Sequence, residues 1–219
     1  MCRIRVQSSI HLQRIMYLEE AILHLSKDAR MLPILQSTSL APLEPSGNVY
    51  FDLLNSIVSQ QLSIRAAETI FNRFCALFPE AYPTAEKLLN TSAEQLRAVG
   101  LSNQKATYLK NVAAFALDNN FDTVPWNKMA DEEILTLLTQ IKGVGRWTAE
   151  MILIFTLARP DIFPADDLGV QQAMTRLCGL TSTGKSLHRD MIAHADCWRP
   201  YRSTASRLLW RWKDLRTSF

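Results

Sequence analysis

The chain has 219 residues, of which 47% are hydrophobic and 21% charged, and its formal net charge is +3. This composition is typical of a folded soluble protein with a sizeable core, in one domain or two closely packed lobes. Thr156 interrupts the longest apolar run, Met151 to Ala158, so no stretch reaches the roughly 20 apolar residues that cross a bilayer. Met1 to Ile15 lacks the continuous apolar core of a secretion signal. We expect neither a membrane protein nor a secreted one.

The four cysteines are far apart in the sequence, at Cys2, Cys75, Cys178 and Cys197, and none belongs to a CxxC pair. A zinc knuckle or an iron–sulfur loop needs closely spaced cysteines, so the sequence indicates neither. Reduced thiols in a cytosolic protein are the expected state. No cofactor is expected.

Helical periodicity dominates the chain, and no convincing run of alternating strand residues is present. The first helix is expected over Tyr17 to His24, and the residues before Met16 are either a tail or a misassigned start. Ser63 is the expected N-cap of a later helix, and Thr91 with Glu94 predicts a capping box for a short one. Together with a longer helix predicted further on, at Asn103 to Asp118, the pattern gives roughly ten helices and an all-α fold class.

Residues 134–158 predict a helix, a tight turn at 142–145 and a second helix that opens at Arg146 or Trp147. The first of these helices is expected to begin at an Asp131 cap. Two glycines in the turn allow positive φ and a close backbone approach, and the free amides that follow suit a phosphate. Ordinary helical hairpins also turn on glycine, so the pattern alone leaves both interpretations open.

Two aspartates, Asp166 and Asp167, come directly before the next predicted helix. Aspartate is a favoured N-cap, but one cap does not need two carboxylates. Further on, the residues from Asp196 to Phe219 include six basic and two acidic side chains, a local excess of four positive charges. A solvated helix face and a phosphate-facing patch both fit this excess.

The run Ile141 to Ala149, followed by Phe163 to Asp167, resembles the helix-hairpin-helix and Gly/Pro-Asp signature of the HhH-GPD DNA glycosylase superfamily. Within that superfamily the chain looks like the 3-methyladenine DNA glycosylase II type. The stretches Ile57 to Ser63 and Trp198 to Ser203 agree with this, as does Trp210. The resemblance covers nearly everything from about Tyr50 to Trp212.

The resemblance implies an all-α fold of two helical lobes that flank a DNA-binding cleft. Residues 50–159 would form the middle lobe with the helix-hairpin-helix, and residues 160–219 a C-terminal lobe with the catalytic aspartate. Residues 1–49 would supply an N-terminal tail and a helix packed on the C-terminal lobe. The shorter members of the family, which lack an additional β-rich N-terminal domain, are the better match.

The activity implied by the resemblance is a monofunctional DNA glycosylase, which flips alkylated bases out of duplex DNA and removes them by hydrolysis. Asp167 matches the catalytic aspartate, which leaves Asp166 as the expected helix cap. An ionised carboxylate would stabilise the oxocarbenium-like sugar as the glycosidic bond breaks. Strand-cleaving relatives carry a lysine where this chain has Trp147, and Lys142 is expected to face the DNA backbone. No lyase activity is therefore expected.

The remaining site residues are also assigned by resemblance. Cationic alkylated bases stack favourably on aromatic rings, although tryptophans without the resemblance are more often core residues. The base pocket is expected at Trp147, Trp210, Met151 and Leu168, and the DNA wedge at Gln61 or Leu62. The phosphate contacts are expected from the backbone amides of Gly143 and Gly145 and the side chain of Thr148, and a monovalent cation at the carbonyls of Thr139, Ile141 and Val144.

The expected partner is damaged double-stranded DNA, bound by a monomer that has no membrane association. A bacterial protein of this kind would be cytoplasmic and nucleoid-associated, and a eukaryotic one nuclear. Three alternatives stay open: a catalytically inactive DNA-structure-binding protein of the same fold, a glycosylase for another lesion such as uracil, and a generic helical interaction module. Asp167 and Trp210 argue against the first, and the hairpin with its aspartates argues against the last.

Overall fold

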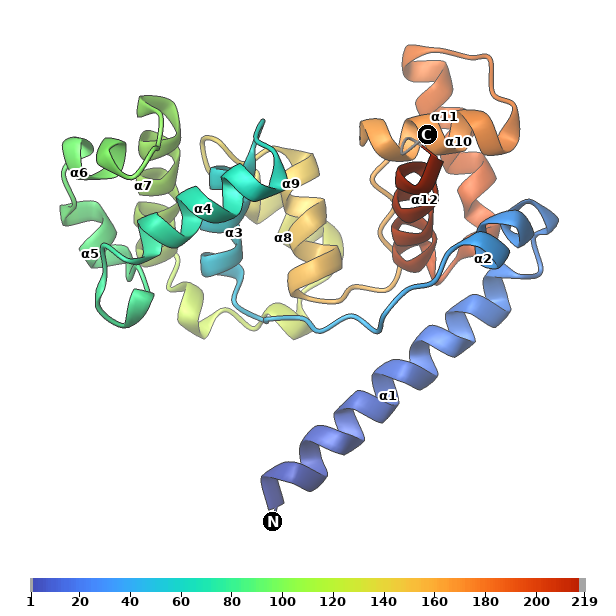
Figure 1. The fold of residues 1–219 in the computed structure, drawn as a ribbon, viewed down its shortest axis with the longest axis horizontal. Coiled ribbons are helices and arrows are strands. Elements are labelled where there is room, and N and C mark those ends of the chain that lie inside the picture. Colours follow the sequence, from blue (N-terminus) through green and yellow to red (C-terminus); the bar gives the residue numbers. More distant parts are fainter. Residues whose placement is uncertain (1, 217–219) are drawn as a thin grey trace. The chain divides into compact units, whose positions relative to one another are not determined.

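The computed structural model describes residues 2–216, and it describes side chains from residue 10 to residue 215. Over that range the chain forms twelve α-helices and no strand, which confirms the all-α fold class (Figure 1). It divides into two compact units, one of residues 45–157 and one of residues up to 44 together with those from 158 onward. We call them the hairpin unit and the terminal unit. The sequence predicted divisions after residues 49 and 159.

The hairpin unit is built around α7, which packs against α5 and α3. Its helix begins where the Ser102 hydroxyl accepts a hydrogen bond from the Lys105 amide at 3.2 Å. Ala106, Leu109 and Val112 form its buried face, as the periodicity predicts. The unit's helices are α3 (Val49–Ser59), α4 (Ile64–Cys75), α5 (Ala85–Asn90), α6 (Ala93–Ala98), α7 (Asn103–Asp118), α8 (Asp131–Leu138), α9 (Arg146–Met151) and a π-helix at Ile152–Thr156 that continues α9.

Two helix starts in the hairpin unit differ from the prediction by one residue. The capping box of α6 is formed by Ser92 and Gln95, whose side chains each accept the other's backbone N–H, at 3.1 and 2.9 Å. Thr91 and Glu94 were therefore the wrong pair. Asp131 is the first residue of α8 and not its cap, because the helix is entered through Ala130. The predicted Ser63 cap of α4 is confirmed.

The terminal unit packs α10 and α2 against α12, which forms its centre. Its helices are α1 (Cys2–Leu25), α2 (Leu32–Ser37), α10 (Leu168–Cys178), α11 (Gly184–Ala195) and α12 (Arg202–Arg216). The backbone is helical from Cys2, in place of an irregular tail before Met16. The largest fully buried side chain is Trp198, and its core neighbours include Leu25, Met31, Ile34, Phe163, Met174, Leu208 and Leu209.

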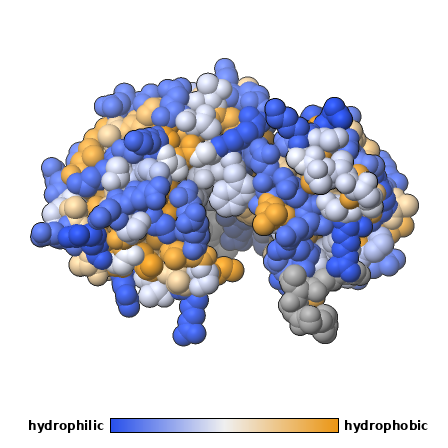
Figure 2. Space-filling view, turned by 90° about the horizontal axis from the view of Figure 1, so that it is seen from above, coloured by the Kyte–Doolittle hydropathy of each residue, from blue (hydrophilic) through white to orange (hydrophobic). Residues whose placement is uncertain are grey.

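The visible face of each unit mixes hydrophilic and hydrophobic residues (Figure 2). Among the described helices, none is long and apolar enough to cross a membrane. Of the cysteines whose side chains are described, Cys75, Cys178 and Cys197 are all free thiols.

Candidate active site

Asp167 is the N-cap of α10, and its Oδ1 accepts a hydrogen bond from the Val170 amide at 2.8 Å. The prediction that Asp166 caps this helix is therefore wrong. A turn closed by the Asp167 amide on the Pro164 carbonyl brings the second aspartate, not the first, to the start of the helix. Asp166 is exposed, and its carboxylate lies 3.6 Å from His188 Nε2. One carboxylate, that of Asp167, thus holds the helix start and is also the catalytic candidate.

Trp210 on α12 reaches the same carboxylate. Its indole Nε1 donates to Asp167 Oδ1 at 2.7 Å, so this oxygen accepts two N–H donors. An ionised carboxylate only accepts hydrogen bonds, and two fixed donors restrict its rotation. The structure therefore brings together two of the residues that the sequence singled out, Asp167 and Trp210, within the terminal unit.

Gly169 makes the approach of Trp210 to Asp167 possible, and sequence reasoning missed it. A Cβ on Gly169 would lie 3.0 Å from Trp210 Cδ1 and 3.1 Å from Asp167 Oδ1. Any larger residue would press on both members of the pair. The available signal was a glycine in the first turn of a helix, where it lowers helix propensity without evident local reason.

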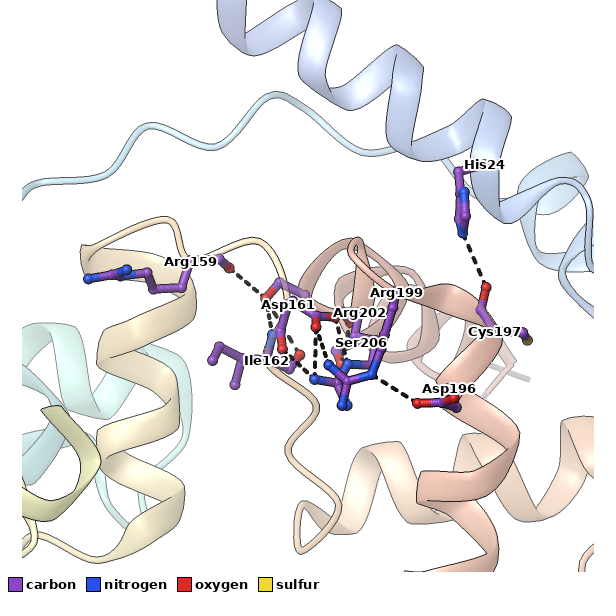
Figure 3. A network of polar contacts seen from close by, with 10 residues as sticks. His24, Arg159, Asp161, Ile162, Asp196, Cys197, Arg199, Arg202 and Ser206 are labelled. Atoms are coloured by element: carbon purple, nitrogen blue, oxygen red, sulfur yellow. Dashed lines mark hydrogen bonds and ion pairs between the residues drawn. The ribbon is translucent and has the colours of Figure 1, made fainter. Parts of the chain in front are cut away.

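A polar network fastens the segment after Ala158 to the start of α12 (Figure 3). The Asp161 carboxylate accepts from Arg199 Nη1 and from Arg202 Nε, both at 2.6 Å. Ser203 Oγ donates to the Arg159 carbonyl at 2.6 Å, and accepts from the Ile162 amide at 2.9 Å. Two of the six basic residues near the C-terminus are thus paired inside the terminal unit. The network holds the chain that leads into Asp167 against the helix that carries Trp210.

The hairpin turn uses its two glycines differently. Gly143 has φ +108°, and a Cβ there would overlap the ring of Tyr108. Gly145 has φ −90°, which any residue adopts, and its Cβ would meet nothing within 4 Å. The fold therefore requires a glycine only at position 143. At position 145, the N-cap of α9, glycine keeps the first amides of the helix open to approach.

The other predicted residues of the hairpin unit lie on α9 and in two turns. Trp147 is 42% exposed, which argues against a core role, whereas the side chain of Thr148 is buried. This burial argues against the phosphate contact predicted for the Thr148 side chain and leaves only its backbone N–H as a candidate. Gln61 and Leu62 lie exposed in the turn between α3 and α4, followed by Ile64, which is 89% exposed and which sequence reasoning did not select.

Met151 is half-buried on α9, and Leu168 of the terminal unit is 67% exposed beside Asp167. The carbonyls proposed for a cation follow α8, at Thr139, Ile141 and Val144, and the Ile141 carbonyl accepts the Val144 amide at 2.9 Å. Within the described part of the chain, no group of three or more acidic, histidine or cysteine side chains is placed to hold a metal ion.

Comparison with known proteins identifies the family. Residues 54–200 match the model of the HhH-GPD superfamily of base excision DNA repair proteins. The chain belongs to this superfamily. The resemblance inferred from the hairpin and the aspartate pair is confirmed.

Several relatives of this HhH-GPD protein are named DNA-3-methyladenine glycosylases. The chain is 36% identical over 168 residues to DNA-3-methyladenine glycosylase 1 of Schizosaccharomyces pombe, covering 76% of this chain and 73% of the relative. It is 32% identical to the putative DNA-3-methyladenine glycosylase YfjP of Bacillus subtilis, over 89% of this chain and 69% of the relative. A solved structure of the Schizosaccharomyces pombe 3-methyladenine DNA glycosylase in complex with abasic DNA superposes with a TM-score of 0.76 at 32% identity, over 87% of this chain and 95% of that one.

Proposed function

We propose that this HhH-GPD protein is a DNA glycosylase that removes alkylated bases of the 3-methyladenine kind from duplex DNA in base excision repair. The observation that carries the proposal is the Asp167 carboxylate, held at the start of α10 by the Val170 amide and the Trp210 indole. Relatives named for 3-methyladenine removal, at 36% and 32% identity, support the choice of substrate class.

The proposed chemistry needs a fixed negative charge more than it needs a proton donor. As the bond between base and sugar breaks, C1′ gains positive charge, which an ionised carboxylate stabilises. A cationic alkylated base departs as a neutral molecule, so it demands no strong general acid. Asp167 would stabilise the charged sugar and orient the water that attacks it. The two donors on Oδ1 would keep the carboxylate in one orientation throughout.

The same enzyme is proposed to lack lyase activity. Cleaving the strand through a Schiff base requires an amine that attacks C1′, and strand-cleaving relatives place a lysine where this chain has Trp147. Lys142 lies exposed at the hairpin tip, where the Asn111 amide holds its carbonyl at 3.0 Å. This placement supports a role for Lys142 toward the DNA backbone, as the sequence predicts.

The hairpin is proposed as the phosphate anchor, through the backbone amides at Gly143, Gly145 and Thr148. A monovalent cation at the carbonyls of Thr139, Ile141 and Val144 would add positive charge beside the phosphate, and neutral carbonyl oxygens suit such an ion. The predicted base contacts stay predictions, both those of Trp210 and Leu168 in the terminal unit and those of Trp147 and Met151 in the hairpin unit. So do the preference for damaged DNA, the glycosylase II type and action as a monomer.

The experiment that tests the proposal measures free base released from methylated duplex DNA, with strand breaks scored before and after alkali. A monofunctional alkyl-base glycosylase releases methylated purines and leaves breaks that appear only after alkali. Breaks without alkali would overturn the absence of lyase activity. Tight binding to abasic DNA without any base release would instead favour a catalytically inactive DNA-structure-binding protein of the same fold.

A further inference from the structure

The turn between α3 and α4 holds both candidate wedge residues in an unusual backbone conformation. Gln61 has φ +58°, in the left-handed region that side chains other than glycine rarely adopt. Leu62 is 38% exposed, and Ile64, the first residue of α4, is 89% exposed, so apolar surface in and directly after the turn faces solvent. Contacts from outside the turn must therefore hold its shape.

Lys105 supplies such contacts from α7. Its Nζ donates to the Val58 carbonyl at 2.7 Å and to the Gln60 carbonyl at 2.8 Å, on the two sides of the end of α3. An ammonium group at the C-terminus of a helix satisfies free carbonyls and meets the negative end of the helix dipole. Partial burial lowers the pKa of Lys105 from its ordinary value of 10.5. Lys105 thus fixes the residues immediately before Gln61.

The next two turns of α7 hold the hairpin. The ring of Tyr108 occupies the space where a Cβ of residue 143 would lie, and Asn111 Nδ2 donates to the Lys142 carbonyl at 3.0 Å. Residues three apart follow one face of a helix, so Lys105, Tyr108 and Asn111 line up along α7. A longer contact of 3.4 Å, from Gln60 Nε2 to the Gly143 carbonyl, joins the two turns directly.

We propose that Lys105 is a positioning residue for the DNA wedge, because it locks the turn of residues 60–62 onto α7 at a fixed spacing from the hairpin tip. The inference rests on the proposed function, in which the hairpin holds the DNA backbone while Gln61 or Leu62 fills the gap left by an extruded base. A side chain can fill that gap only if its distance from the anchored backbone is set in advance. Here that distance is set by Lys105, Tyr108 and Asn111, which lie along one face of α7.

The chain offers a matched control on the same helix. Lys110 also lies on α7, and its Nζ donates to the Leu89 carbonyl in the last turn of α5 at 3.0 Å. Lys105→Met and Lys110→Met each keep the apolar stem and remove one ammonium group from a helix end. Both should lower the free energy of unfolding to a similar extent, whereas only Lys105→Met should affect the wedge. Lys105→Arg keeps the positive charge, so it should retain part of the wedge function that Lys105→Met loses.

The first test compares base release in single turnover from two duplexes, each with one 3-methyladenine or 7-methylguanine. In one duplex the lesion is paired, and in the other it faces an abasic-site analogue, which makes extrusion easier. Lys105→Met should slow release from the paired lesion by about tenfold or more, with a much smaller effect on the unpaired one. Lys110→Met should change neither rate by more than about twofold. Equal losses on both duplexes, or equal behaviour of the two variants, would overturn the inference.

The second test does not depend on base release. A duplex with 2-aminopurine beside an abasic-site analogue reports unstacking through its fluorescence, which a wedge increases. The wild-type protein and Lys110→Met should raise this fluorescence at saturation, and Lys105→Met should not. If the wild type and Lys110→Met raise it, Lys105→Met does not, and the wild type releases no methylated base, the proposed function fails and the role of Lys105 stands. If Lys105→Met raises it fully, the role of Lys105 fails.

Discussion

The indole of Trp210 donates a hydrogen bond of 2.7 Å to Asp167 Oδ1, so α12 orients the carboxylate at the start of α10. The same oxygen accepts the Val170 amide and thereby caps α10. Gly169 leaves room for the indole, and the Asp161 network ties the segment leading to Asp167 to the start of α12. The Val170 amide, which is local, and the Trp210 indole, which is distant in sequence, thus donate to the same oxygen.

Trp210→Phe tests this orientation, because it removes the Nε1 donor and keeps most of the ring. We expect kcat for base release to fall by about tenfold, the effect of losing one hydrogen bond to a charged group. Trp212→Phe is the control, since this buried tryptophan lies two residues along the same helix. Single-turnover rates on methylated duplex DNA measure the difference. A Trp210→Phe enzyme as fast as Trp212→Phe would show that the hydrogen bond is dispensable.

Asp167→Asn removes the charge while keeping an oxygen for both donors. Asparagine is as good an N-cap as aspartate, so the free energy of unfolding should change by less than about 1 kcal/mol. Base release should fall by about a thousandfold, while affinity for abasic-analogue duplex stays close to that of the wild type. Asp166→Asn, a change at the exposed neighbour, should leave base release within about twofold. If both variants retain release, Asp167 is not the catalytic group.

Some helices and caps that depend on neighbouring residues could be predicted from the sequence, although the starts of α6 and α8 were each placed one residue off. The periodicity gave the bounds of α7, and the Ser63 cap followed from its position before an apolar pattern. The choice between Asp166 and Asp167 as the cap could not be made locally. Two adjacent aspartates are equivalent by local sequence. They are distinguished only by the turn after Pro164, which places Asp167 at the helix start, and by the indole of Trp210, 43 residues further on, which contacts Asp167.

The missed residues have partners that are distant in the sequence. Lys105 contacts carbonyls 45 and 47 positions away, and nothing in its own neighbourhood on α7 distinguishes it from Lys110. The positive charge near the C-terminus had two open interpretations, a solvated face or a phosphate patch. The structure adds a third, because Arg199 and Arg202 pair with Asp161, whose position relative to α12 only the folded chain sets.

The two hairpin glycines should respond differently to alanine. Gly143→Ala forces a side chain into a left-handed backbone and against Tyr108, which should lower the free energy of unfolding by about 2 kcal/mol or more. Gly145→Ala has space and an ordinary φ, so it should cost at most about 1 kcal/mol, through the weaker cap. Its methyl group would nevertheless stand before the free amides of α9, and affinity for abasic-analogue duplex should fall about tenfold.

Urea unfolding and fluorescence anisotropy with a labelled duplex separate these effects. A Gly145→Ala protein that binds the duplex as tightly as the wild type would argue against phosphate contact at the hairpin. A Gly143→Ala protein with unchanged stability would mean that Tyr108 moves aside at no cost.

Acid stability should depend on Asp28, which contacts both its near neighbour Arg30 and the distant Trp198. Its carboxylate accepts from Arg30 Nη2 at 2.7 Å and from Trp198 Nε1 at 2.9 Å. Burial alone would raise the pKa of Asp28, but these hydrogen bonds hold it at about 2, below the ordinary 3.8. A carboxyl group with a lowered pKa in the folded state stabilises the fold above its unfolded pKa. That contribution is lost as the pH falls from about 4 toward 2.

Asp28→Asn should therefore lower the free energy of unfolding at pH 7 by roughly 2 kcal/mol, the equivalent of the pKa difference. The gap between wild type and variant should narrow steadily below pH 4, because the wild-type carboxyl becomes protonated there as well. Urea unfolding at pH 7, 4 and 3 measures this gap, with Glu20→Gln on the exposed face of α1 as the control. A gap that stays constant over this range would show that the loss comes from altered packing around Trp198 and not from the ionised carboxylate.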